Sequence, residues 1–288
     1  MSSFATPLVT YSKMIKLSHT IFALPFALAA AVLASSVQVP TVWQIVLIIL
    51  CMVTARSSAM GFNRIVDRDI DAKNPRTAGR EIPAGKISVS AAWLFTLLSA
   101  ALFVGFSALL GWLTLALAPI ALLVIWGYSV AKRYTALCHL VLGLALALAP
   151  SAVWIAITGS YGWVPLALSV AVGTWVAGFD VIYSCQDAEF DVDNGLHSIP
   201  GALGVRGALI ASALLHVVTM ASLAVVPMFT ALGWPYWVGL VVIGGVLAYE
   251  HYLVRPDDLS KINKAFFDLN GYVSLAFLVF VLGAWWLG

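Results

Sequence analysis

The sequence predicts an all-α protein that crosses a membrane several times. Of its 288 residues, 62% are hydrophobic and only 10% are charged, and the mean hydropathy is +0.99. A soluble globular chain carries about 25% charged residues, so this class is excluded. Apolar runs of about 17–25 residues, the length that spans a bilayer as a helix, recur along the chain. We therefore expect a polytopic helical bundle that forms a single membrane-embedded domain over residues 1–288.

Nine apolar segments are long enough to span the membrane. We place them at 17–36, 41–63, 88–110, 112–131, 136–158, 163–185, 206–230, 234–254 and 265–287. The short connections at 111 and 159–162 predict tight turns, since they are rich in glycine. The first apolar run is expected to be the first span and not a cleavable signal peptide.

The basic residues predict the orientation of the spans. Fourteen of the fifteen Lys and Arg residues lie before the first segment or after the second, fourth, sixth and eighth. They are Lys13, Lys16, Arg64, Arg68, Lys73, Arg76, Arg80, Lys86, Lys132, Arg133, Arg206, Arg255, Lys261 and Lys264. All thirteen acidic residues lie near the same face. By the positive-inside rule, that face is cytoplasmic in a prokaryotic-type cell or inner membrane, and the N-terminus and the active site lie on it.

Several other classes of function are not expected. The net charge is only +2 and no long basic tract occurs, so a nucleic-acid partner is not predicted. Three cysteines without metal-ligand spacing are interpreted as packing residues or reduced thiols; they are Cys51, Cys138 and Cys185. Five scattered histidines do not form a zinc pattern and are expected to be mostly structural; they are His19, His139, His197, His216 and His251.

The first candidate site follows the second apolar segment. Asp67 and Asp71 are four residues apart, and Asn63 precedes Asp67 by four, so all three share one face of a helix. Carboxylates crowded beside lipid are costly unless a cation lies between them. Mg²⁺ prefers carboxylate oxygens and commonly bridges aspartates to substrate phosphates. This pattern therefore predicts magnesium bound together with a phosphate-bearing substrate.

The second candidate site repeats this layout at the end of the sixth segment. Asp180, Tyr183, Asp187 and Asp191 are spaced by three, four and four residues, and Asp180 lies about 10 Å deeper than Asp187. A lone intramembrane aspartate is either a proton relay or bonded to a neighbouring helix. The alignment with Asp187 and Asp191 favours a position facing the pocket. Other acidic residues point away from these faces and are expected to be solvated; they are Asp69, Glu189 and Asp193.

Arg56 is the one basic residue inside a span. It precedes Asn63 by seven residues, and so lies about 10 Å deeper on the same helix face. It is either a structural arginine paired within the bundle or an anion receptor at the bottom of the pocket. Further groups are expected to bind a diphosphate near the mouth; they are Arg76, Arg80, Lys86, Tyr128 and Lys132. Arg133 either joins them or anchors the cytoplasmic loop.

These motifs resemble those of the UbiA superfamily of intramembrane aromatic prenyltransferases, over essentially the whole chain. The N-x-x-x-D-x-x-x-D motif corresponds to Asn63, Asp67 and Asp71, and the Y-x-x-x-K element to Tyr128 and Lys132. The D-x-x-Y-x-x-x-D-x-x-x-D motif corresponds to Asp180, Tyr183, Asp187 and Asp191. Segments 18–28, 74–88 and 197–204 are similar to the group of 4-hydroxybenzoate polyprenyltransferases, which includes the enzyme of the futalosine route to menaquinone.

The resemblance implies nine helices around a central cavity, under a cap of cytoplasmic loops. It also implies transfer of a polyprenyl group from polyprenyl diphosphate to a carboxylated aromatic acceptor in menaquinone or ubiquinone biosynthesis. Mg²⁺ held by the four motif aspartates would assist departure of the diphosphate, the lipid tail would lie beside membrane lipid, and Asn63 would organise the site. Arg56 would grip the acceptor's carboxylate, and Asp180 would either position the acceptor or take a proton.

Several alternatives are open at this level. The acceptor is 4-hydroxybenzoate, a dihydroxynaphthoate or another carboxylated arene, and the isoprenoid length is not set. A CDP-alcohol phosphotransferase is also a membrane transferase, but its D-x-x-D-G-x-x-A-R element is absent. A multi-span transporter would carry charges along a pore or on both faces. The charges here gather at one face, which favours a one-sided catalytic chamber.

Overall fold

The computed structural model describes residues 5–15 and 20–287. Over these ranges the regular structure is helical, and no strand forms beyond an isolated bridge between Arg255 and Asp258. The chain divides into two compact units: residues 1–20 with 43–130, and residues 21–42 with 131–288. Lys16, His19 and the beginning of the first expected span lie outside the described residues.

Eight helical segments of the described chain are long and apolar enough to cross a membrane. They are α3 (Val42–Val66), α5 (Val89–Leu110), α6 (Trp112–Ala131), α7 (Cys138–Thr158), Trp163–Asp193, Ile199–Met228, α11 (Trp234–Leu253) and Ile262–Leu287. The first apolar segment forms α2 (Thr20–Ala34), which has only 15 residues and contains Pro25. At 1.5 Å per residue it is shorter than the hydrocarbon core of about 30 Å. The all-α polytopic fold is thus confirmed, with the first of the expected spans the short one.

In the first unit, α3 packs against both α5 and α6. A Cβ on Gly61 would collide with the Thr96 hydroxyl of α5, so this glycine lets the two helices approach closely. On the other side, the Trp126 indole of α6 donates to Ser58 Oγ at 3.0 Å. Phe62 stacks on Trp126 with ring centroids 5.1 Å apart. These contacts fix the end of α3 from which the first carboxylate pair extends.

The connection between α4 (Arg68–Lys73) and α5 is anchored by a small apolar cluster. It contains Met14 of α1 (Ala5–Met14), Ile65, Ile82, Ile87 and Ala92. Ile82 and Ile87 are buried although they lie in a segment without helix. Burying these two side chains holds the segment in place close to Asp67 and Asp71 of the same unit.

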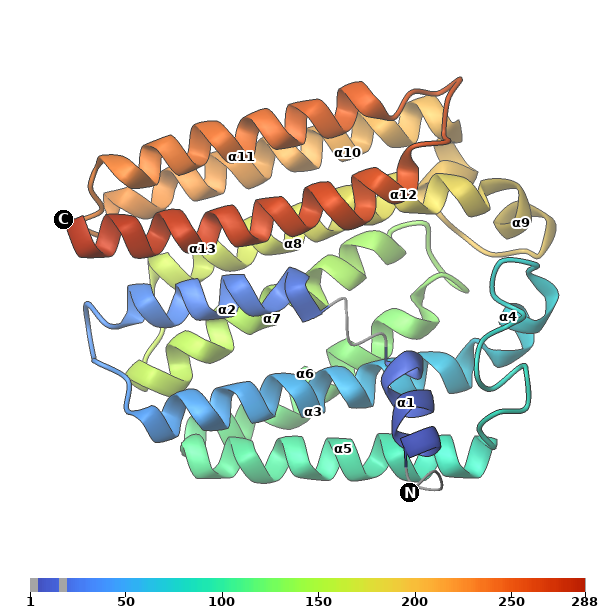
Figure 1. The fold of residues 1–288 in the computed structure, drawn as a ribbon, viewed down its shortest axis with the longest axis horizontal. Helices are drawn as coiled ribbons and strands as arrows, with labels where there is room; N and C mark the ends of the chain where they lie inside the picture. Colours follow the sequence, from blue (N-terminus) through green and yellow to red (C-terminus); the bar gives the residue numbers. More distant parts are fainter. Residues whose placement is uncertain (1–4, 16–19, 288) are drawn as a thin grey trace. The chain divides into compact units, whose positions relative to one another are not determined.

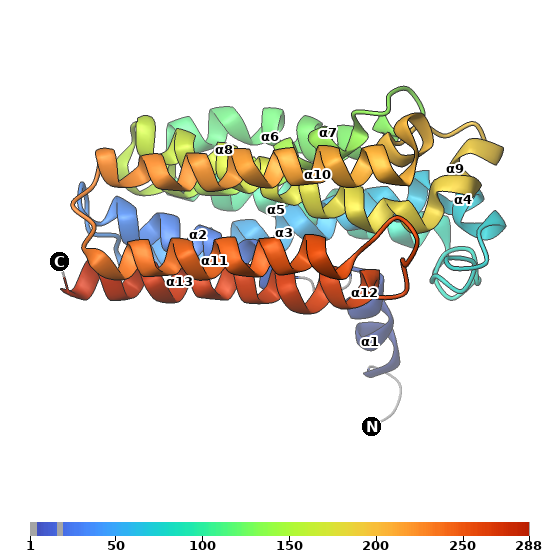
Figure 2. The same ribbon diagram turned by 90° about the horizontal axis from the view of Figure 1, so that it is seen from above.

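In the second unit, α8 (Trp163–Ser184) packs against α7 and α10 (Ile199–Val225), and α11 packs against α13 (Asn270–Leu287) (Figures 1 and 2). Small residues allow the closest of these approaches. A Cβ built on Gly143 of α7 would overlap the backbone carbonyl of Gly173 of α8. Close contact between small residues is a common way for membrane helices to associate, because lipid offers no hydrophobic drive.

A buried aromatic and polar cluster joins four helices of this unit. Trp175 of α8 is fully buried and contacts Phe26 of α2, which stacks on Phe277 of α13 at 4.7 Å. The Trp175 indole donates to Asn270 Oδ1 at 2.8 Å, and Asn270 Nδ2 donates to Glu250 Oε1 of α11 at 2.9 Å. Trp175, Asn270 and Glu250 each gain a hydrogen-bond partner in this way, which limits the cost of placing them in the bundle.

A short helix precedes the expected span at 206–230. α10 begins at Ile199, where Ser198 Oγ caps it by accepting from the amide of Gly201 at 3.2 Å. Gly204 interrupts the helix with a left-handed φ of 68°, a conformation that favours glycine. The segment before Arg206 is thus a short capped helix that turns into the span. The remainder of the apolar run continues through η3 (Val226–Met228).

The six most exposed tryptophans lie at helix ends away from the charged residues, whereas the less exposed Trp93 lies near the beginning of α5. Four stand at or near the beginning of α3, α6, α8 and α11, and two at the end of α13; they are Trp43, Trp112, Trp163, Trp234, Trp285 and Trp286. Tryptophan is enriched where a helix passes from lipid to water. This distribution agrees with helices that begin or end at a membrane surface.

Candidate active site

The first carboxylate pair lies where α3 gives way to α4. Asp67 separates the two helices, but the amide of Asp67 still donates to the carbonyl of Asn63 at 2.9 Å, and that of Asp71 to Asp67 at 2.7 Å. The helical hydrogen-bond pattern between residues four apart therefore continues through the motif. Asp67 and Asp71 are each only 3% exposed. Asn63 Nδ2 donates to Asp67 Oδ2 at 3.0 Å, so the expected neighbours on one helix face do meet.

Arg64 belongs to this cluster, although it was expected only to be one of the basic residues that follow the second segment. It is 3% exposed, and its Nη1 donates to Asn63 Oδ1 at 3.1 Å. This bond fixes the amide of Asn63 so that its nitrogen points to Asp67. A basic residue directly beside the motif asparagine was a signal that could have been used to find it.

Arg80 pairs with Asp71, although the sequence placed it among the diphosphate-binding groups. Its Nη1 lies 2.6 Å from Asp71 Oδ1, and the pair is largely buried. The other carboxylate oxygen, Oδ2, is buried and has no hydrogen-bond partner within the described residues. A buried anionic oxygen without a donor is costly, so this position suits a cation.

Arg56 and Tyr128 lie near this cluster within the first unit. Arg56 is partly buried in α3, and Tyr128 is in the last turn of α6. The Tyr128 hydroxyl lies within electrostatic range of Arg56, Arg64 and Asp67. The structure thus gathers the deep arginine, the tyrosine and the first carboxylate on facing sides of α3 and α6.

The second carboxylate motif follows α8 through a change of helix type. Asp180 lies in α8, Asp187 ends the 3₁₀ turn η2 (Cys185–Asp187), and Asp191 is buried in α9 (Ala188–Asp193). Asp187 and Lys132 both lie within electrostatic range of Asp191. Lys132 therefore lies close to this pair within the second unit.

Tyr183, the remaining member of the second motif, packs its ring on Phe266. The centroids are 4.1 Å apart, and Phe266 belongs to the π-helical turn η4 (Ala265–Leu269) that precedes α13. This aromatic contact gives Tyr183 a packing role, which stands beside the substrate-binding role expected of it.

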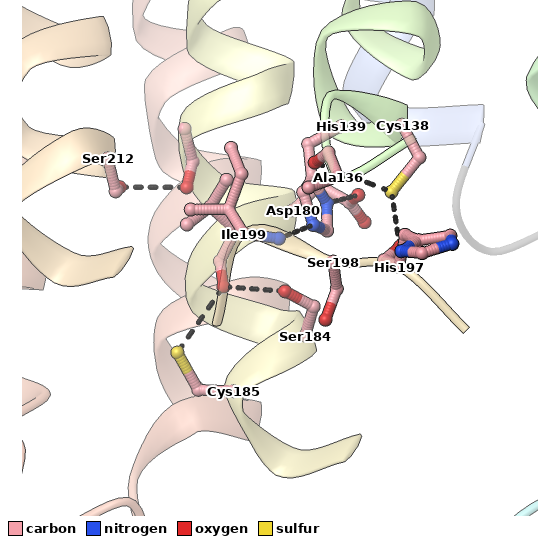
Figure 3. A network of polar contacts seen from close by, with 12 residues as sticks. Ala136, Cys138, His139, Asp180, Ser184, Cys185, His197, Ser198, Ile199 and Ser212 are labelled. Atoms are coloured by element: carbon pink, nitrogen blue, oxygen red, sulfur yellow. Dashed lines mark hydrogen bonds and ion pairs between the residues drawn. The ribbon is translucent and has the colours of Figure 1, made fainter. Parts of the chain in front are cut away.

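Asp180 is bonded to a histidine. His139 Nδ1 lies 2.7 Å from Asp180 Oδ2, and the ring is buried in the first turn of α7 (Figure 3). His139 was expected to be merely structural, because nothing in its spacing links it to residue 180. His197, whose role was left open, is exposed. The intramembrane position of a histidine was a weak signal that it had a polar partner.

Most of the other charged side chains near the motifs are exposed. The acidic side chains away from the motif faces are exposed; they are Asp69, Glu189 and Asp193. Arg76 and Lys86 are also exposed, in the connection that follows α4, and Arg133 is half-buried. Exposed basic groups at the end of a span suit the binding of an anion that arrives from water.

The carboxylates fit magnesium in donor type and number. Among the residues that the structure describes, no three acidic, histidine or cysteine side chains gather into a complete metal site. Mg²⁺ does not need such a cage, since it is usually held by one or two carboxylates together with substrate phosphates and water. The partnerless Oδ2 of Asp71 and the half-exposed Asp187 supply oxygen donors of this kind.

The sequence profile of the UbiA prenyltransferase family matches residues 23–281. The chain belongs to this family. It is similar to the 4-hydroxybenzoate octaprenyltransferase of Vibrio campbellii, with 29% identity over 261 residues that cover 86% of this chain and 91% of the relative. The enzyme of the same name from Saccharophagus degradans is 31% identical over 243 residues, which cover 83% of this chain and 80% of the relative.

Solved structures agree with this membership in the UbiA family. The apo structure of a UbiA homologue from Aeropyrum pernix is 32% identical, has a TM-score of 0.79, and covers 92% of this chain and 96% of that one. A UbiA homologue from Archaeoglobus fulgidus, bound to GPP and Mg²⁺, is 21% identical with a TM-score of 0.76, and covers 96% and 99% of the two chains. The second likeness supports the fold alone. The protein is thus a multi-pass membrane protein of the UbiA fold.

Proposed function

We propose that this UbiA-family protein transfers a polyprenyl group from a polyprenyl diphosphate to a carboxylated aromatic acceptor in quinone biosynthesis. The observation that carries the proposal is the buried Asn63–Asp67–Asp71 cluster, in which Asp71 Oδ2 has no donor among the described residues. A second carboxylate motif ends another membrane-length segment, with Lys132 close to Asp191. The 4-hydroxybenzoate octaprenyltransferases to which the chain is similar support the substrate classes.

The two carboxylate pairs and the nearby basic groups would bind the diphosphate of the prenyl substrate. Asp67 and Asp71 would hold one magnesium ion, and Asp187 and Asp191 another. Bound Mg²⁺ would offset the charge that develops on the diphosphate as its bond to the prenyl carbon breaks. Lys132 and Arg76 would bind the diphosphate oxygens, and Arg80 would hold Asp71 in place through its 2.6 Å contact. Both units would then belong to one catalytic domain.

The groups that lie deeper in the helices would bind the aromatic acceptor. The C–O bond of the prenyl diphosphate breaks, and the diphosphate leaves with the electron pair. The allylic cation is shielded from water by apolar walls, and the ring carbon ortho to the hydroxyl attacks it, after which that carbon loses its proton. Arg56 would bind the acceptor's carboxylate, since a guanidinium can form two parallel hydrogen bonds to it. Asp180 would contact the acceptor's hydroxyl.

The active site is proposed to face the cytoplasm. The basic residues cluster at one set of helix ends and the six most exposed tryptophans at the other, which supports this orientation. Single cysteines at Ala78 and Asp257 should then be labelled only from the cytoplasmic side of membrane vesicles. Cysteines at Gly159 and Gly233 should be labelled only from the opposite side. Labelling of Ala78→Cys from outside would overturn the orientation.

Incubating purified protein with radiolabelled prenyl diphosphate and a panel of aromatic acids tests the proposed activity. We expect a prenylated arene to form in proportion to released diphosphate, only when Mg²⁺ is present, and the panel identifies the preferred acceptor. A transporter would release no diphosphate. A CDP-alcohol phosphotransferase, supplied with a CDP-alcohol in a parallel assay, would instead transfer its phosphoalcohol group and release CMP. Either result would replace the proposed function.

A further inference from the structure

His139 makes one hydrogen bond from each nitrogen of its ring. Nδ1 lies 2.7 Å from Asp180 Oδ2 in α8, and Nε2 accepts the backbone N–H of Ile199 at 3.3 Å (Figure 3). Ile199 is the first residue of α10. A single buried side chain in α7 therefore holds both a carboxylate inside α8 and the beginning of α10.

These two bonds determine the tautomer of the ring. Because Nε2 accepts the proton of an amide, it carries no proton itself. Nδ1 must then carry the proton, which it donates to the carboxylate of Asp180. The ring is neutral, and both of its nitrogens are satisfied, so it has one orientation available. A histidine held in this way acts as a fixed donor to its carboxylate, as in pairs that orient metal ligands.

Three neighbouring bonds lock the same region. The amide of His197 donates to the carbonyl of Lys132 at 2.7 Å, and the Cys138 thiol donates to the carbonyl of His197 at 3.5 Å. The amide of Leu196 donates to the carbonyl of Asp191 at 2.8 Å. The backbone of Lys132 and the backbone of Asp191 are therefore tied to the same short segment as His139. Figure 3 shows the contact of Cys138 with His197 beside the bonds of His139 to Asp180 and Ile199.

Asp180 has one oxygen left for a ligand. Its side chain is 24% exposed, whereas that of His139 is only 4% exposed. Oδ2 accepts from His139, and Oδ1 has no hydrogen-bond partner among residues 5–15 and 20–287. A carboxylate fixed by one oxygen presents the other in a defined direction, which suits a hydroxyl donor such as the phenol of an aromatic acceptor.

We infer that His139 is a positioning residue for prenyl transfer: its Nδ1–H aims the Asp180 carboxylate at the acceptor's phenolic hydroxyl. Through Nε2 it also fixes this carboxylate relative to the segment that holds Lys132 and Asp191 in register. The inference rests on the proposed function, because it assigns a role at the acceptor end of that reaction. It predicts that His139 affects the acceptor far more than the prenyl diphosphate.

Two substitutions separate the two bonds of the ring. In His139→Asn, the side-chain amide can take the place of Nδ1–H and still donate to Asp180, but it is too short to reach Ile199. In His139→Gln, the longer side chain can accept from Ile199 but offers Asp180 no donor at the right position. His197→Gln is the matched control, since it makes the same change at an exposed histidine whose side chain contacts neither Asp180 nor Ile199.

We expect His139→Gln to lower kcat/KM for the acceptor by roughly tenfold or more, the size of effect seen when a bond to a charged group is lost. KM for the prenyl diphosphate should change by less than about threefold. His139→Asn should recover most of the loss, and His197→Gln should stay within about twofold of the unmodified protein. In an Asp180→Asn background, His139→Gln should add little, because both changes disrupt the same interaction.

Equal losses in the Asn and Gln variants, or losses shared equally between the two substrates, would show that His139 is only structural. Additive effects of His139→Gln and Asp180→Asn would also overturn the inference.

¹⁵N spectra of histidine-labelled protein add a readout that does not need turnover: His139 should show a protonated Nδ1 and an unprotonated Nε2. If the unmodified protein prenylates no carboxylated arene, the proposed function fails and this role fails with it, whereas active protein with the opposite tautomer refutes this inference alone.

Discussion

The two carboxylate motifs have the same spacing in the sequence but are supported in different ways. Asp67 and Asp71 are held by residues close to them along the chain, with Asn63 bonded to Asp67 and Arg80 to Asp71. In the second unit, Asp180 is held by His139, which is 41 residues away in sequence. The first motif is thus a locally built cluster, and the second depends on how α7, α8 and α10 pack. Substitutions of distant residues should therefore perturb the second motif more than the first.

The largest effects on turnover are expected from the motif aspartates themselves, and they should be similar in the two motifs. Asp67→Ala and Asp187→Ala should each lower kcat at least on the order of a hundredfold, because each removes an oxygen donor that offsets charge on the diphosphate. Additional Mg²⁺ should not restore full activity. Asp69→Ala is the control, since that side chain is 81% exposed and points away from the motif. Near-normal turnover in both motif variants would refute the two-motif mechanism.

Arg56 tests the deep end of the first unit. Arg56→Ala should lower kcat/KM for the aromatic acid roughly ten- to a hundredfold, as a charge-assisted bond in a partly buried site is lost. KM for the prenyl diphosphate should move much less. Arg56→Lys should recover only part of the loss, because an ammonium lacks the planar fork of a guanidinium. If the diphosphate affinity falls instead, the two ends of the pocket have been assigned in reverse.

Arg64 tests the local support of the first motif. Arg64→Leu removes the donor that fixes the Asn63 amide, and we expect kcat to fall by about tenfold through Asp67. Arg68→Gln provides the comparison, since that arginine follows the same motif but its side chain is 43% exposed. Steady-state assays with both substrates measure the difference. Equal activity in the two variants would remove Arg64 from the account.

The packing of the second unit gives the smallest expected effect on turnover and the clearest effect on stability. Gly143→Ala would place a methyl group against the Gly173 carbonyl, a backbone atom that cannot rotate away. We expect a loss of about 1–3 kcal/mol in the free energy of unfolding, seen as a lower unfolding temperature in detergent. Gly105→Ala, in open space, should be neutral or stabilising. Equal unfolding temperatures would mean that α7 and α8 are not tightly packed at this point.

The sequence was sufficient for the features that depend on local pattern. Apolar length predicted the helices of the polytopic bundle, and the spacing of four predicted that Asn63 would meet Asp67, as the 3.0 Å bond confirms. It was not sufficient where backbone geometry depends on a single residue. Gly204 interrupts the helix with its left-handed φ, so a short helix that begins at Ile199 precedes the span expected from 206. Only the folded chain shows the cap at Ser198 that begins this short helix.

The supporting residues were harder to predict than the motif residues. His139 and Asp180 meet because α7 and α8 pack closely through Gly143 and Gly173, which no local pattern records. Arg64 looked like one more loop cation, and its burial at the end of α3 distinguishes it from its neighbour Arg68. Long-range packing decides both cases, and spacing along the chain does not encode it.

The proposed function requires both carboxylate motifs to bind the same diphosphate through magnesium. Equilibrium binding of a prenyl thiodiphosphate that does not ionise, measured as Mg²⁺ is titrated, tests this requirement without turnover. We expect strong Mg²⁺-dependent binding to the unmodified protein, and loss of that dependence in Asp67→Asn and in Asp187→Asn alike. If either variant keeps the full Mg²⁺ dependence of the unmodified protein, the two motifs do not act on the same diphosphate.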